Sequence, residues 1–156
     1  MFFVEAHYHH SPRRAADQVR YIAHREEFGY DDAVVKRLED YVQRNLATLR
    51  RAIKAGVPIA MGSDAVFTGF GQNMGELRWF VKLGMTNAEA LQSATLAPAE
   101  MLGMGKSLGQ VAPGFLADIV AVEGDPLADI GVVIDKVRWV MKAGVVVVDK
   151  TRPAAR

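Results

Sequence analysis

A long amphipathic helix that leads directly into a short apolar strand is the feature that most constrains this chain. Apolar residues recur at helical spacing over residues 32–54, with charged residues between them, and Gly56 follows as a typical helix terminator. Residues 57–61 are then Val-Pro-Ile-Ala-Met, an apolar run that ends at Gly62. A helix followed at once by a buried strand is half of a βαβ unit, so the sequence predicts an α/β fold.

Shorter helices are predicted after this strand. Asn73 with Glu76, and Thr86 with Glu89, have the spacing of capping boxes. Pro98 lies near the start of a further short helix that Gly103 ends.

The periodicity changes from helical to strand-like after residue 105. Four short runs rich in valine and isoleucine are predicted to be strands: 118–122, 132–134, 137–141 and 145–148. Ala143-Gly144 is predicted to be the tight turn that joins the last two. We therefore divide the chain into α/β units in residues 1–105, a small antiparallel β domain in residues 106–150, and a tail in residues 151–156.

Composition excludes several classes of protein. The chain has 156 residues, half of them hydrophobic, and a formal net charge of only +1. This charge gives no field that would favour nucleic acid or an anionic membrane. The absence of cysteine excludes disulfides, a thiol nucleophile and a Cys-ligated zinc site. No apolar run reaches the roughly 18 residues of a membrane span, so we expect no membrane partner. The first residues lack the basic segment of a signal peptide, so we expect a cytoplasmic location.

Asp64 is the strongest candidate for a functional residue. It follows Gly62-Ser63 at the end of the predicted strand, and catalytic groups of α/β barrels and open sheets sit at the carboxyl ends of strands. A carboxylate there can bind a divalent metal and accept a proton from the attacking water. An aspartate in an ordinary turn after a strand is the equally good alternative.

His7 and His9 are weaker candidates. Alternate residues of a strand point to the same face, so this pair can share a metal, but surface histidines at a strand end have the same pattern. The glycine-rich residues 69–75 do not match dinucleotide or P-loop spacing. Ser63 lacks the G-x-S-x-G setting of a serine hydrolase.

Several segments taken together resemble the metal-dependent amidohydrolase superfamily, in particular its peptidase branch of imidazolonepropionase-like and prolidase-like enzymes. The resemblance covers roughly residues 36–150 and is carried by residues 54–65, 90–100, 108–120 and 124–130, with a closing hairpin at 140–144. It implies the C-terminal βα units of a (β/α)8 barrel, followed by part of a small β-sandwich domain.

The resemblance also implies a function. It makes Asp64 a metal ligand and general base, with zinc as the metal and a small amide or dipeptide as the substrate of a dipeptidase-like or carboxypeptidase-like hydrolysis. Asp64 is the only metal residue of the family that carries over, because His7 and His9 fall where the seventh barrel strand would be.

The alternative is a catalytically inactive fragment that acts as a structural or self-associating module. A third possibility is a separate metal site formed by His7, His9 and Asp64. We expect a homo-oligomer, or dependence on an N-terminal portion that this chain lacks.

Overall fold

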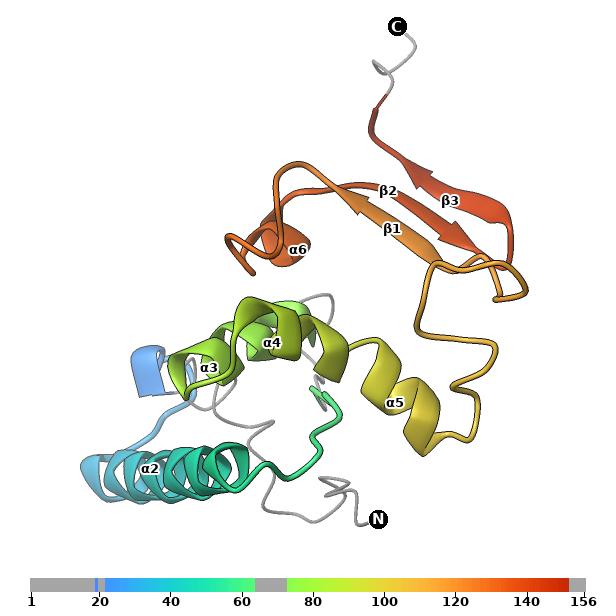
Figure 1. Cartoon of the computed structure of the whole chain (residues 1–156). Helices are drawn as coiled ribbons and strands as arrows, with labels where there is room; N and C mark the ends of the chain where they lie inside the picture. The colour runs from blue at the N-terminus through green and yellow to red at the C-terminus, as the bar shows by residue number, and fades with distance from the viewer. Residues whose placement is uncertain (1–18, 20–21, 64–72, 152–156) are drawn as a thin grey trace, which may run out of the picture. The chain divides into compact units, whose positions relative to one another are not determined.

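The computed structural model describes residue 19, residues 22–63 and residues 73–151. These residues form two compact units, one up to residue 85 and one from residue 86 onward, which are described separately. The elements of the first unit are α2 (Asp32–Lys54), the short 3-10 helix η2 (Asn73–Gly75) and α3 (Glu76–Lys82) (Figure 1). The second unit contains α4 (Asn87–Ser93), α5 (Leu96–Met101), β1 (Ile119–Val122), α6 (Val132–Asp135), β2 (Val137–Lys142) and β3 (Val145–Asp149).

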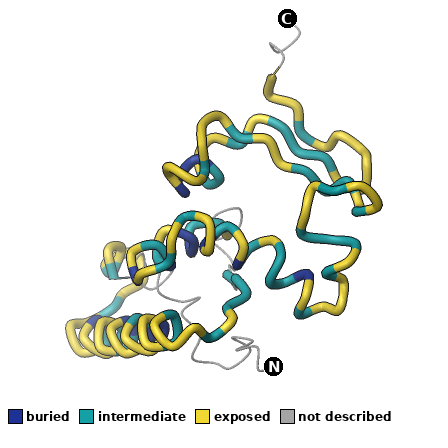
Figure 2. The backbone as a smooth tube through the Cα atoms, in the orientation of Figure 1, coloured by how far each residue is buried: buried dark blue, intermediate teal, exposed yellow. Residues whose placement is uncertain are grey.

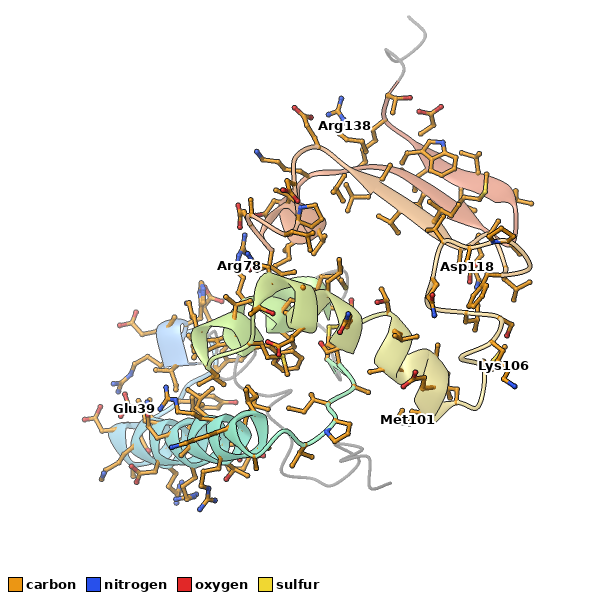
Figure 3. All side chains as sticks on the ribbon, viewed as in Figure 1. Glu39, Arg78, Met101, Lys106, Asp118 and Arg138 are labelled. Carbon is orange, nitrogen blue, oxygen red and sulfur yellow. The ribbon has the colours of Figure 1, made fainter. Side chains whose placement is uncertain are left out.

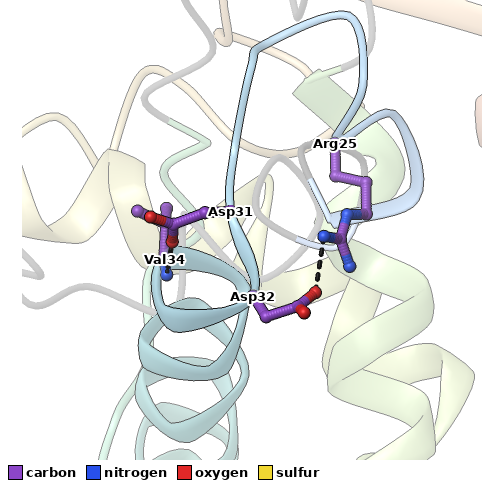
Figure 4. Close-up of polar contacts among 4 residues, drawn as sticks. All are labelled: Arg25, Asp31, Asp32 and Val34. Atoms are coloured by element: carbon purple, nitrogen blue, oxygen red, sulfur yellow. Dashed lines mark hydrogen bonds and ion pairs between the residues drawn. The ribbon is translucent and has the colours of Figure 1, made fainter.

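Helix α2 confirms the predicted helix at both ends. Asp31 caps its start, because the side chain accepts a hydrogen bond of 2.8 Å from the backbone N–H of Val34 (Figure 4). The Arg25 guanidinium lies 2.6 Å from the Asp32 carboxylate in the first turn, where the helix dipole also favours a negative charge. At the other end Gly56 has φ +66°, the left-handed conformation that closes a helix.

The buried side of α2 is a single stripe. Val35, Val42 and Leu49 are buried at intervals of seven residues, and the opposite side of the helix is exposed (Figure 2). Asn45 interrupts this stripe: it is 8% exposed, and its Nδ2 atom has no hydrogen-bond partner in the part of the chain that the structure describes. A buried donor without an acceptor is destabilising, so Asn45 is a weak point of this face.

The predicted strand at residues 57–61 is shorter than expected. Among residues 57–63 only Ile59 forms a strand-type bridge. Pro58 contributes to the difference because its nitrogen cannot donate to a ladder of hydrogen bonds.

The two predicted capping boxes have different outcomes. The Asn73–Glu76 box is wrong: α3 begins after Gly75 without a side-chain cap, because residues 73–75 form the 3-10 turn η2. The Thr86–Glu89 box is confirmed. Glu89 N–H donates to Thr86 Oγ1 over 3.2 Å, and Thr86 N–H donates to Glu89 Oε2 over 2.7 Å.

A three-stranded antiparallel sheet of order β1-β2-β3 dominates the second unit. Ala143 and Gly144 both have positive φ, 48° and 81°, as in the two-residue turns that match the twist of a hairpin. The Asp118 carboxylate holds this turn: it accepts from the backbone N–H of Ala143 over 2.7 Å and from Lys142 Nζ. Figure 3 shows Asp118 at this end of the sheet. The predicted strands 118–122, 137–141 and 145–148 are therefore confirmed, with shifts of one residue at their ends.

The predicted strand at 132–134 is wrong, because these residues form α6. The Asp129 carboxylate accepts from Gly131 N–H over 2.7 Å, and Asp135 N–H bonds to Gly131 O over 3.0 Å. These local bonds close one helical turn and outweigh the β preference of the two valines.

Candidate functional site

The residues on either side of the 64–72 segment are joined by a hydrogen bond. Asn73 Nδ2 donates to Ser63 Oγ over 3.0 Å, across ten positions of the sequence. Ser63 closes the stretch that follows α2, and Asn73 opens η2. This bond fixes the distance between Ser63, the immediate neighbour of the candidate Asp64, and the start of η2.

Sequence reasoning missed this role of Asn73. The spacing to Glu76 predicted a helix cap, whereas the Asn73 amide donates back to Ser63. The residue type gave one indication of this role, because the side-chain amide of an asparagine can donate hydrogen bonds to backbone or side-chain acceptors. The sequence, however, contains no indication that residue 63 would lie within reach.

Glu76 is the only acidic side chain among the buried residues of the described chain, with 4% exposure. It lies in the first turn of α3, where the helix dipole favours a carboxylate. A buried carboxylate needs hydrogen-bond or charge partners to offset its desolvation, and Glu76 does have such an interaction. Glu76 is therefore a buried carboxylate at the start of α3, directly after η2.

Asp64, His7 and His9 all lie outside the described residues. Their roles therefore stay predictions. Across residues 19, 22–63 and 73–151, no three His, Asp or Glu side chains are close enough together to hold a metal ion. The described residues do not by themselves fit a catalytic zinc, which takes about three protein ligands.

The second unit has one clearly perturbed carboxyl group at the sheet. Hydrogen bonds from the Lys142 side chain and the Ala143 backbone hold the pKa of Asp118 below its usual value. This carboxylate stabilises the hairpin turn and has no cluster of titratable groups around it that indicates chemistry. No helix in the described ranges is long and apolar enough to cross a membrane.

The sequence model of the amidohydrolase family matches residues 4–147. The chain belongs to the amidohydrolase family. This match confirms the resemblance predicted from the segments between residues 54 and 144.

Several of the proteins to which this chain is similar are named as hydrolases. Ochratoxinase from Aspergillus niger is 38% identical over 98 residues, which are 62% of this chain and 20% of that protein. Its crystal structure superposes with a TM-score of 0.70, at 30% identity over 88% of this chain and 31% of that one. A prolidase crystallised with N-methylphosphonate-L-proline has a TM-score of 0.74 and 34% identity over 85% of this chain and 33% of that one. A Xaa-Pro dipeptidase with bound methionine has a TM-score of 0.72 and 31% identity, and the match covers 85% of this chain and 33% of that one.

This chain therefore spans about a third of each matching structure. The described helices and antiparallel sheet correspond to part of an amidohydrolase barrel protein, which confirms the predicted fold class. The activity of the matching proteins belongs to chains about three times as long.

Proposed function

We propose that this chain is the part of an amidohydrolase that carries Asp64, and that the complete catalytic unit hydrolyses a C–N bond in a small dipeptide-like substrate. The observation that carries this proposal is the family match over residues 4–147. The prolidase and Xaa-Pro dipeptidase among the similar structures favour a dipeptide substrate over larger amides.

Asp64 is proposed as the general base and as one metal ligand. Its carboxylate would accept a proton from the attacking water and then deliver that proton to the leaving nitrogen, which must be protonated before it can depart. A divalent metal, with zinc as the expected ion, would supply Lewis acidity to the reaction. One carboxylate cannot hold such an ion, so further ligands must come from residues outside 19, 22–63 and 73–151, across which no metal-binding cluster is present.

The hydrogen bond between Asn73 and Ser63 supports the proposed position of Asp64. A catalytic carboxylate must be held within a fraction of an ångström of its productive geometry. The backbone of Ser63 precedes Asp64 directly, and its side chain is tied to η2 over 3.0 Å. A residue in an unconstrained surface turn would not need this support.

A catalytically inactive module is the second candidate. It is favoured by the sheet of the second unit, in which no residue of the three described strands is buried and Val120, Val145 and Val147 are each more than half exposed. Apolar strands exposed in this way are suited to contact with further polypeptide. In this case the chain would contribute packing surface and no catalytic group.

Hydrolysis of dipeptides by the purified chain separates the two candidates. We would supply zinc or manganese and measure amino-acid release from Xaa-Pro and other dipeptides, with wild-type chain, Asp64→Asn and Asp40→Asn. Asp40 is the matched control, because it is an exposed acid on α2 paired with Lys36 over 3.4 Å. We expect metal-dependent release by wild type and Asp40→Asn, and a loss of about a hundredfold or more in kcat/KM for Asp64→Asn.

Equal activity of wild type and Asp64→Asn would reject the catalytic proposal, because it removes Asp64 from the chemistry. The absence of release above the metal-only blank for every dipeptide would assign this chain by itself to the inactive module.

A further inference from the structure

We draw no further inference here: the strongest candidate, the exposed apolar edge of the second unit's sheet formed by Val145, Val146 and Val147 of β3, carries none, because nothing in the structure shows what covers it.

Discussion

Gly109 lies where the chain passes very close to the start of α5, and its replacement by alanine tests this packing. Its φ is +88°, and a Cβ atom there would lie 2.8 Å from Thr95 O, 2.9 Å from the Leu96 Cα and 3.1 Å from the Ala99 Cβ. The first two of these are backbone atoms, which cannot move aside as a flexible side chain can. Gly109→Ala therefore combines a strained backbone with overpacking.

The two contributions can be separated with Gly114. Gly114 has almost the same φ, +87°, but a Cβ there would meet no atom within 4 Å. The left-handed backbone costs alanine about 1–2 kcal/mol, and the reduced entropy of the unfolded chain returns about 0.4–1 kcal/mol, so we expect Gly114→Ala to lose at most about 1.6 kcal/mol. Overpacking adds about 1–3 kcal/mol, which brings Gly109→Ala to about 1–4.6 kcal/mol.

Urea unfolding followed by far-ultraviolet circular dichroism measures both variants against wild type. The difference between them isolates the steric cost, because the two glycines have nearly the same φ. An unfolding free energy for Gly109→Ala within about 0.5 kcal/mol of that for Gly114→Ala would refute the close approach of this segment to α5.

Three further predictions concern single side chains. Thr86→Ala should lower the free energy of unfolding by about 1 kcal/mol in a urea titration, because it removes the acceptor of the Glu89 N–H bond. The hydrogen bond from Lys142 lowers the pKa of Asp118, so the contribution of this carboxylate to the hairpin should be fully present above about pH 4, the ordinary pKa of an aspartate. The protection of the turn amides against hydrogen exchange, relative to the intrinsic rate at each pH, should fall as the pH falls through the lowered pKa, and an Asp118→Asn chain should lack this change. Asn45→Leu should raise the unfolding free energy by about 1 kcal/mol, since it removes a buried donor without an acceptor; a loss of stability in this variant would show that the amide has a partner.

Local sequence signals predicted most of the fold. The helix at 32–54 carries its own cap, its apolar period and its terminating glycine, so its ends follow from residues next to them. The hairpin at Ala143-Gly144 is equally local. The wrong prediction of a strand at 132–134 came from its valine-rich composition. The hydrogen bond from Gly131 N–H to the Asp129 carboxylate favours the helical turn instead, and it depends on a side-chain conformation that composition does not encode.

The candidate site was less accessible to sequence reasoning. Asp64 was singled out by its place after an apolar run and by family resemblance, and both clues are contained in neighbouring residues. The bond between Asn73 and Ser63 depends on how the chain returns after ten positions, which periodicity does not encode. Metal ligands are harder still, because they converge from distant segments, and the described residues contain no such cluster.

Paramagnetic broadening by Mn²⁺ tests most directly whether Asp64 binds metal. Manganese added to the isotopically labelled chain broadens the NMR signals of nearby amides even when binding is weak, so the test does not require a complete set of ligands. We expect selective broadening at Gly62 and Ser63 in wild type and in Asp40→Asn, and its loss in Asp64→Asn. Broadening that is absent from these amides, or that persists unchanged in Asp64→Asn, would contradict the assignment of Asp64 as a metal ligand.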